Sequence, residues 1–243
     1  IGATCTVEGT FELDASIMEG KDLSAGAVAG LKHVKHPINA AYAVKTKSPH
    51  VMLSGAGAEE FAKEQGLEMV DDNMYFATPK TMEWIEKLKQ ESKKNGTVGC
   101  VVLDKQGNLT AGTSTGGMFK KRWGRIGDSP VIGAGTYADN NSCAVSCTGH
   151  GEYFIRHAVA FDVCARYKYL KESVEKAADY IIHTELNTNA GNGGLIAVDK
   201  LGNIAMPYNS GGMFRGFLYK EKGRPEIKKG CGIGKKIVVV GEK

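Results

Sequence analysis

The stretch Asn95-Gly96-Thr97-Val98-Gly99 joins a charged segment, residues 87–95, to an apolar run of strand type, residues 98–103. If the bond between Gly96 and Thr97 were cut, the threonine would become a new N-terminus. Its hydroxyl could then attack a carbonyl carbon while the freed α-amine, with an unperturbed pKa of roughly 7.7–8.0, accepts the proton. The stretch therefore predicts a β-strand that begins with a threonine nucleophile.

Two segments downstream carry groups that such a nucleophile needs. Thr115 lies 18 positions after Thr97, on the expected return strand of a hairpin, so its hydroxyl can lie beside the first threonine. The loop Gly124-Arg125-Ile126-Gly127-Asp128-Ser129-Pro130 offers a cation, Arg125, and an anion, Asp128, three residues apart. These residues predict an assisting hydroxyl and a clamp for a zwitterion.

A third segment, Ser146-Cys147-Thr148-Gly149-His150-Gly151-Glu152, is a turn of small residues that leads from a strand into a long helix. Backbone N–H groups and a hydroxyl at a helix start stabilise negative charge, as an oxyanion hole requires. Together, the three segments predict hydrolysis of an amide in an amino-acid-like substrate.

The run from Gly96 to about Gly216 closely resembles the plant-type asparaginase / isoaspartyl peptidase family of N-terminal nucleophile hydrolases. The resemblance extends upstream through residues 13–30, His36-Pro37 and residues 48–51, and so covers most of the chain. It implies an α/β fold, the four-layer αββα sandwich of these hydrolases. The shared words are GTVG, TSTGG, GRIGDSP, GAGTYADN, SCTGHGE, GGLIAVDKLGN, GGMFRG and, upstream, LDASIMEGKDLSAGAVAG and SPHV.

The resemblance also implies catalytic roles. Thr97 is expected to be the nucleophile, freed by self-cleavage between Gly96 and Thr97, with its α-amine as base and Thr115 assisting its hydroxyl. The Thr148 hydroxyl and the Gly149 N–H are expected to bind the oxyanion. The alternative for Thr115 and Thr148 is an ordinary strand or cap hydroxyl.

The same resemblance implies how a substrate is held. Arg125 is expected to grip the α-carboxylate in a two-pronged bond, and Asp128, with the Gly151 carbonyl, to hold the α-ammonium. The alternative for Arg125 and Asp128 is a local surface ion pair that contributes little.

The expected activity is hydrolysis of L-asparagine to aspartate and ammonia and of β-aspartyl (isoaspartyl) dipeptides. Residues 1–96 would be the α subunit after self-cleavage and residues 97–243 the β subunit, together one domain, and the resemblance implies a homodimer of such cleaved units. One alternative is glycosylasparaginase, in which an aspartate usually precedes the nucleophile and an asparagine usually replaces Gly116. The other is an unprocessed, non-catalytic relative that acts as a binding scaffold.

Composition sets bounds on these expectations. The 243 residues carry a net charge of +4, without a long basic run interleaved with aromatic residues, so nucleic-acid binding is not supported. No apolar stretch approaches membrane-span length, and residues 1–20 lack the pattern of a signal peptide. The six cysteines are scattered, and no second pair follows the C-x3-C of Cys143 and Cys147. We therefore expect reduced thiols in a cytoplasmic enzyme that uses no cofactor or catalytic metal.

An internal repeat relates residues 98–120 to residues 193–215. Each copy has an apolar run, an Asp-Lys-x-Gly-Asn turn, a return strand and a Gly-Gly-Met-Phe-cation ending, which predicts two hairpins. Between them, Phe154, Ala158, Phe161 and Ala165 fall at helical spacing. A second helix is expected from the apolar stripe that begins at Val174 and ends at Ile182.

The two ends of the chain depart from the family pattern. By resemblance, Ile1-Gly2-Ala3 is similar to the tail of a further motif, and a core strand, a structural sodium-binding loop and part of the active-site wall would precede it. Near the other end, the apolar residues 237–240 are similar to the family's opening strand. Since an open central edge is a liability in a sheet, we expect residues 237–240 to pair in that place.

Overall fold

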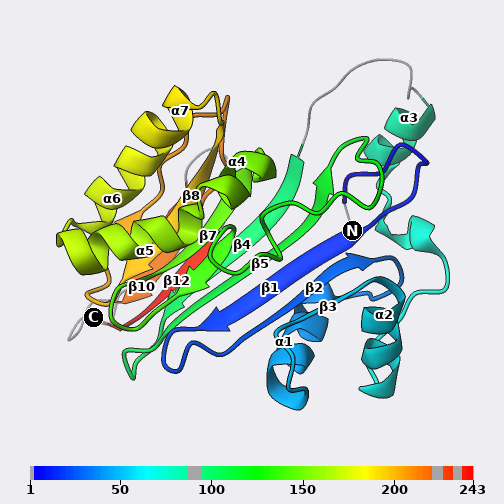
Figure 1. Ribbon diagram of the computed structural model, residues 1–243, viewed down its shortest axis with the longest axis horizontal. Coiled ribbons are helices and arrows are strands. Elements are labelled where there is room, and N and C mark those ends of the chain that lie inside the picture. Colours follow the sequence, from blue (N-terminus) through cyan, green and yellow to red (C-terminus); the bar gives the residue numbers. More distant parts are fainter. Residues whose placement is uncertain (1–2, 87–94, 221–226, 232–236, 243) are drawn as a thin grey trace.

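The computed structural model describes residues 3–86, 95–220, 227–231 and 237–242, which form two β-sheets with helices on both sides (Figure 1). The first sheet has the strand order β11-β10-β12-β4-β5-β1-β2-β3. Its strands are β1 (Leu13–Glu19), β2 (Ala25–Leu31), β3 (Met52–Ser54), β4 (Asn95–Leu103), β5 (Leu109–Met118), β10 (Gly216–Lys220), β11 (Ile227–Cys231) and β12 (Ile237–Glu242).

The second sheet is antiparallel and has the order β6-β7-β8-β9. All seven residues of β8 are buried, because helices cover one face of this strand and the first sheet covers the other. The strands are β6 (Thr136–Ala138), β7 (Cys143–Gly149), β8 (Gly193–Asp199) and β9 (Ile204–Ala205).

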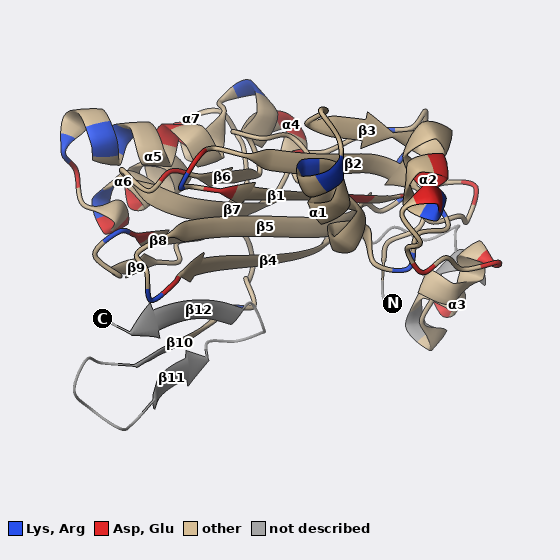
Figure 2. Cartoon of the chain, turned by 90° about the horizontal axis from the view of Figure 1, so that it is seen from below, with Lys and Arg blue, Asp and Glu red and all other residues tan. Residues whose placement is uncertain are grey.

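Two groups of helices lie at opposite sides of the sheets (Figure 1). Next to the first sheet are α1 (Pro37–Lys47) and α2 (Gly55–Glu64), followed by a 3-10 turn (Asn73–Phe76) and α3 (Pro79–Glu86). Next to the second are α5 (Val159–Leu170) and α6 (Val174–Tyr180), with the shorter α4 (Gly151–Arg156), a π-helical turn (Ile181–Glu185) and α7 (Leu186–Thr188). Charged residues gather on these helices and on the turns, whereas the strands β4, β5 and β7 are mainly uncharged (Figure 2).

Three clusters of buried apolar side chains hold the elements together. One lies between α1, α2 and the first sheet, and another between α5, α6 and the second sheet. The third contains residues of both sheets, such as Val101 and Leu109 from the first and Ile196 and Val198 from the second. The two sheets therefore share a core, and burial of this apolar area is the main force that joins them.

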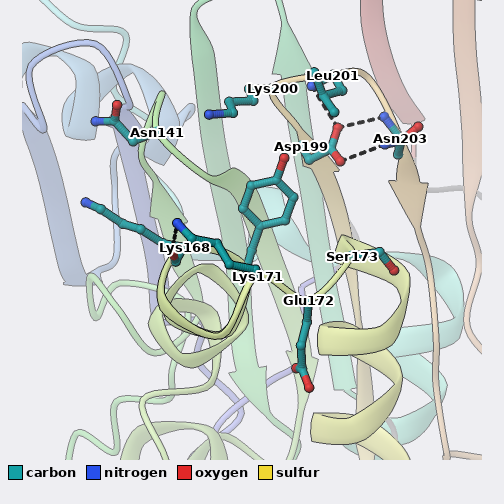
Figure 3. A pocket seen from close by; sticks show the side chains of 10 residues that line it. Asn141, Lys168, Lys171, Glu172, Ser173, Asp199, Lys200, Leu201 and Asn203 are labelled. Carbon is teal, nitrogen blue, oxygen red and sulfur yellow. Dashed lines mark hydrogen bonds between the residues drawn. The ribbon is translucent and has the colours of Figure 1, made fainter.

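The internal repeat is confirmed as two hairpins with the same turn, β4–β5 in the first sheet and β8–β9 in the second. Asp104 Oδ1 accepts hydrogen bonds from the backbone N–H groups two and four residues later, at 2.9 and 2.7 Å. Asp199 Oδ1 repeats both bonds at 2.8 Å, and its contact with Asn203 is drawn in Figure 3. Gly107 and Gly202 supply the positive φ, +83° and +82°, that closes each turn.

The expectation of one helix through residues 154–165 is wrong. The helix α4 ends at Arg156, and Ala158 adopts a left-handed backbone conformation (φ +46°) before α5 begins at Val159. This break rotates the buried face of the second helix, so Phe161 is 43% exposed while Val163 is buried. The second expected helix is confirmed, since its apolar stripe is fully buried, although its last turn is π-helical.

The expectation for residues 237–240 is confirmed. They belong to β12, which pairs in parallel with β4, placing Val239 opposite Val102, and in parallel with β10, placing Ile237 opposite Gly216. A strand from the C-terminal end of the chain thus covers one edge of β4, the strand on which Thr97 lies. The other edge of β4 is covered by β5.

Candidate active site

Thr97 and Thr115 are direct neighbours across the β4–β5 hairpin, as the sequence predicts. Their hydroxyl oxygens are 3.0 Å apart, and the Thr115 hydroxyl donates to the carbonyl oxygen of Gly96 at 3.0 Å. The Gly117 N–H donates to Thr115 Oγ1 at 2.9 Å. Because a hydroxyl has one donor and two acceptor positions, the remaining acceptor of Thr115 receives the Thr97 hydroxyl. Thr115 thus connects the nucleophile to the carbonyl group that it would attack.

Gly96 lies at an irregularity of the hairpin. The register between β4 and β5 shifts between Asn95 and Thr97, so that two residues of β5, Gly116 and Gly117, stand opposite the single residue Gly96 of β4. A bulge of this kind re-aims the groups beside it, and such bulges occur frequently next to active sites. Here the shift leaves the Gly96 carbonyl oxygen to accept from the Thr115 side chain.

Four buried hydroxyl side chains, which we call the hydroxyl bridge, connect the two sheets. They are Ser16 on β1, Thr113 on β5, Thr136 on β6 and Ser146 on β7, and each is at most 1% exposed. Successive oxygens lie at hydrogen-bonding distance: Ser16 to Thr136 at 2.8 Å, Thr136 to Thr113 at 2.6 Å and Thr113 to Ser146 at 2.7 Å. Ser16 also donates to the backbone carbonyl of Ser129 at 2.6 Å. The bridge therefore sets the register of the two sheets and holds the loop that precedes β6.

The bridge places the expected oxyanion turn at the same end of the molecule as the threonine pair. β5 and β7 run in the same direction, because the Leu109 N–H at the start of β5 donates to Asn140 Oδ1 (2.8 Å), just before β7. Thr115 lies two residues beyond one member of the bridge, and Thr148 lies two residues beyond another. Since side chains alternate along a strand, each threonine side chain points to the same side of its strand as the bridge residue two positions before it, which is the side that faces the other sheet. Both threonines lie beyond the bridge, toward the ends of β5 and β7.

The turn after Thr148 has a shape that requires glycine. Gly149 has φ +153° and pairs with Gly193 on β8, and a Cβ built on Gly149 would lie 2.4 Å from the carbonyl oxygen of Asn192. A side chain at this position would collide with backbone. The turn then leads at once into a helix, as the sequence predicts, but the expectation of a long helix is wrong, because α4 has only six residues and ends before the left-handed Ala158.

Arg125, Asp128 and Gly151 meet at one point. A Cβ built on Gly151 would lie 2.8 Å from Asp128 Oδ1 and 2.9 Å from Arg125 Nη2. A side chain at this position would collide with both groups, so glycine is what allows the carboxylate and the guanidinium to lie this close to the start of α4. Asp128 is 5% exposed. The structure thus brings together the three residues that the resemblance assigns to a zwitterion.

Sequence reasoning missed Glu152, which forms a two-pronged ion pair with Arg125. Arg125 Nε and Nη2 donate to the two carboxylate oxygens of Glu152 at 2.8 and 3.0 Å. The guanidinium lowers the pKa of this carboxyl group. Glu152 belongs to the motif SCTGHGE, but its partner Arg125 is 27 residues away in the chain. Residue spacing alone therefore does not reveal the pair.

Asp14 is a second residue that sequence reasoning missed. It lies opposite Thr115 on β1 and is fully buried. Its Oδ1 accepts the Gly30 N–H at 2.8 Å, and its Oδ2 has no hydrogen-bond partner among residues 3–86, 95–220, 227–231 and 237–242. Burial raises the pKa of Asp14, and this effect outweighs the positive charges of Lys121 and Arg125, which lower it. A charged residue between the apolar Leu13 and Ala15, at the start of the strand Leu13–Glu19, was the signal that could have found it.

Two cavities differ in their relation to these groups. One of about 290 Å³ is lined by Gly96, Thr97 and Thr115, together with Lys35 and Phe76. Another, of about 620 Å³, lies where α5 and α6 meet the β8–β9 turn, and Figure 3 shows the lysines and the Asp199 turn around it. None of the predicted site residues lines the larger cavity. The threonine pair thus lines the smaller cavity, whereas Arg125, Asp128, Thr148, Gly149 and Gly151 line neither of the two.

The chemistry of the remaining polar groups is local. In the part of the chain that the structure describes, no group of three or more His, Cys, Asp and Glu residues could hold a metal ion. His33 contacts Glu59 at 3.1 Å, and Cys143 Sγ lies 2.9 Å from Cys164 Sγ on α5. The cysteines with described side chains are free thiols, four of them buried and Cys100 exposed.

No helix among the described residues is long and apolar enough to cross a membrane.

Comparison with known families matches residues 1–226 to a family described as asparaginase. The isoaspartyl peptidase of Salmonella typhimurium is 48% identical over 233 residues, which are 90% of this chain and 74% of that protein. The isoaspartyl peptidase of Escherichia coli is 44% identical over 92% of this chain and 77% of its own length. A probable isoaspartyl peptidase/L-asparaginase 2 of Arabidopsis thaliana is 43% identical over 88% of this chain and 75% of its own length.

The raised pKa of Asp14 predicts a pH-dependent effect of Asp14→Asn. The folded protein binds this proton more tightly than the unfolded chain does, so the stability from the protonated form is present at low pH and is lost as pH rises through the raised pKa. Asparagine does not ionise. The Tm of Asp14→Asn minus that of the parent should therefore become more positive from about pH 4 to 7.

Asp22→Asn is the control for this effect. Hydrogen bonds from Ser24 lower the pKa of Asp22, so this carboxyl group is ionised in both the folded and the unfolded state over most of this range, and the corresponding Tm difference should stay nearly constant from about pH 4 to 7. A Tm difference for Asp14→Asn that is constant across this range would contradict the assignment of a buried, ionisable carboxyl group.

Proposed function

The chain belongs to the asparaginase family, and from this premise we propose that it is a self-cleaving amidohydrolase that hydrolyses L-asparagine to aspartate and ammonia and cleaves β-aspartyl (isoaspartyl) dipeptides. The observation that carries the proposal is the Thr115 hydroxyl. It lies 3.0 Å from the Thr97 hydroxyl and donates to the Gly96 carbonyl oxygen at 3.0 Å. The nucleophile, an assisting group and the bond to be cut are therefore already adjacent.

In the proposed self-cleavage, Thr97 Oγ1 attacks the carbonyl carbon of Gly96. The bond between that carbon and the Thr97 nitrogen breaks, the nitrogen takes the proton and becomes a free α-amine, and water hydrolyses the resulting ester. The hydrogen bond from Thr115 stabilises the negative charge that develops on the Gly96 oxygen. The products are residues 1–96, the α subunit, and residues 97–243, the β subunit, which remain one domain.

Substrate hydrolysis follows the same chemistry with the freed α-amine of Thr97 as base. The hydroxyl attacks the side-chain carbonyl of asparagine or of a β-aspartyl dipeptide, and ammonia or the second amino acid leaves with the proton. Water then hydrolyses the acyl-threonine ester. The Thr148 hydroxyl and the Gly149 N–H are proposed to bind the oxyanion, supported by their place at the end of β7 that the hydroxyl bridge brings toward Thr115.

The aspartyl part of the substrate is proposed to bind where Arg125 and Asp128 approach Gly151. There the guanidinium of Arg125 would bind the α-carboxylate, and Asp128 with the Gly151 carbonyl would bind the α-ammonium. The support is geometric: one point beside Gly151 lies within 3 Å of both an Arg125 nitrogen and an Asp128 oxygen. A positive and a negative group this close together favour a substrate that carries both an α-carboxylate and an α-ammonium over one that carries a single charge.

The wider assignments rest on family membership. We propose the four-layer αββα arrangement of N-terminal nucleophile hydrolases, which the shared core of the two sheets and the two groups of helices support. A homodimer of cleaved units, a cytoplasmic location and catalysis without a cofactor remain predictions. No step of the proposed mechanism uses the structural sodium that the resemblance implies.

The Gly116 position argues against the glycosylasparaginase alternative. A Cβ built on Gly116 would lie 2.7 Å from Ala3 Cβ and 2.8 Å from the Thr4 nitrogen, and Thr4 Oγ1 donates to the Gly117 carbonyl at 2.9 Å. The asparagine expected in that branch would displace this segment. The unprocessed scaffold is distinguished by a denaturing gel, because it would remain a single band.

Thr97→Ala should stay uncut and inactive, because it removes the only hydroxyl proposed to attack the Gly96 carbonyl. A denaturing gel and N-terminal sequencing of the fragments measure the cleavage, and ammonia release from L-asparagine measures the activity. Thr110→Ala, on β5 of the same hairpin, is the control and should be cut normally. The same two fragments from Thr97→Ala would show that another residue or an external protease cuts the chain.

Arg125→Lys should keep self-cleavage but lose about 10- to 100-fold in kcat/KM for L-asparagine, because lysine keeps the charge without the planar, two-pronged donor. Asp128→Asn should be impaired as well, through loss of the charge opposite the substrate ammonium. Arg166→Lys, which alters the ion pair between Arg166 on α5 and Glu172, is the control and should be unaffected. A kcat/KM near the parent value in both site variants would show that the clamp is misplaced.

A further inference from the structure

The contact between Glu152 and Arg125 has a geometry that bears on the substrate clamp. Glu152 lies in the first turn of α4, and its side chain is 51% exposed, whereas the Arg125 side chain is 19% exposed. The two bonds, from Nε at 2.8 Å and from Nη2 at 3.0 Å, use one edge of the planar guanidinium. A two-pronged bond of this kind fixes the plane of the group as well as its position.

The adjoining edge of the guanidinium, formed by Nη1 and Nη2, lies next to Gly127 and Gly151, which have no side chains. A Cβ built on Gly127 would lie 2.9 Å from Arg125 Nη1, and one built on Gly151 would lie 2.9 Å from Nη2. The guanidinium has five N–H donors, of which Glu152 takes two, so Nη1 and the second hydrogen of Nη2 can still bind a carboxylate in a two-pronged bond. Asp128 Oδ1 borders the same Gly151 position at 2.8 Å.

We propose that Glu152 is a positioning residue, which holds Arg125 so that its Nη1–Nη2 edge is presented to the α-carboxylate of the substrate. The proposal rests on the proposed function, since it assumes that Arg125 binds that carboxylate. Arginine side chains have many rotamers, and Gly127 and Gly151 offer no side chain to pack against this one. Fixing the guanidinium before the substrate arrives removes an ordering cost from binding.

A purely structural role makes a different prediction. Half-exposed ion pairs contribute little to stability, and a pair that only joined α4 to its neighbouring loop would affect Tm and leave substrate binding unchanged. A positioning role affects KM instead. Glu152 also places a negative charge near the incoming carboxylate, so a role dominated by that charge would weaken substrate binding, and its removal would lower KM.

Glu152→Gln tests the proposal, because the amide keeps the shape of the side chain but can accept only one of the two N–H groups. We expect KM for L-asparagine to rise about 2- to 10-fold, the cost of ordering one long side chain, while kcat stays within about twofold. Self-cleavage should be complete and Tm unchanged. Glu172→Gln is the matched control. Glu172 accepts a hydrogen bond of 2.9 Å from Arg166 Nε, and this pair lies outside the proposed site, so the KM of the variant should equal that of the parent.

A double-mutant cycle tests whether Glu152 acts through Arg125. In an Arg125→Lys background, Glu152→Gln should cause no further loss of kcat/KM, because the two-pronged pair is already broken. An unchanged or lowered KM in Glu152→Gln, or an equal loss in both backgrounds, would overturn the proposal. These outcomes differ from failure of the proposed function itself, in which the parent protein would neither cut itself nor release ammonia from asparagine.

Discussion

Four buried hydroxyl groups set how the two sheets lie against each other, and the proposed catalytic geometry depends on that register. Apolar packing between the sheets is strong but not directional, so it tolerates small sliding movements. The hydroxyl bridge of Ser16, Thr113, Thr136 and Ser146 does not, because its oxygens are 2.6 to 2.8 Å apart and fully enclosed. Each buried hydroxyl that lost its partner would cost roughly 1–3 kcal/mol.

The bridge also reaches the loops that carry the clamp. The carbonyl of Ser129 accepts from Ser16 at 2.6 Å, next in the chain to Asp128, and the carbonyl of Gly135 accepts from Thr113 at 3.3 Å. The loop that bears Arg125 and Asp128 is therefore fixed to the same four hydroxyls that align β5 with β7. The strands position the threonine pair and the oxyanion turn, and the loop anchored by the bridge positions Arg125 and Asp128.

Sequence reasoning succeeds where the determining interactions are local. The Asp-Lys-x-Gly-Asn turns predict both hairpins, and the hairpin in turn predicts that Thr115 lies beside Thr97. It fails at Ala158, whose left-handed conformation has no signal such as glycine or proline in the sequence. It also misses Glu152 and Asp14, because the first is identified by a contact with a residue on another element and the second by burial. The resemblance supplied the residue roles, which spacing alone does not yield.

The kcat/KM of Thr113→Val for L-asparagine tests the central claim most directly, because valine keeps the shape of threonine but removes the middle hydroxyl of the bridge. None of the proposed catalytic or clamp residues is changed. If the bridge aligns the two halves of the site, kcat/KM should fall by at least about 10-fold, since small misplacements of reacting groups have effects of that order or larger. A kcat/KM equal to that of the parent protein would contradict the account.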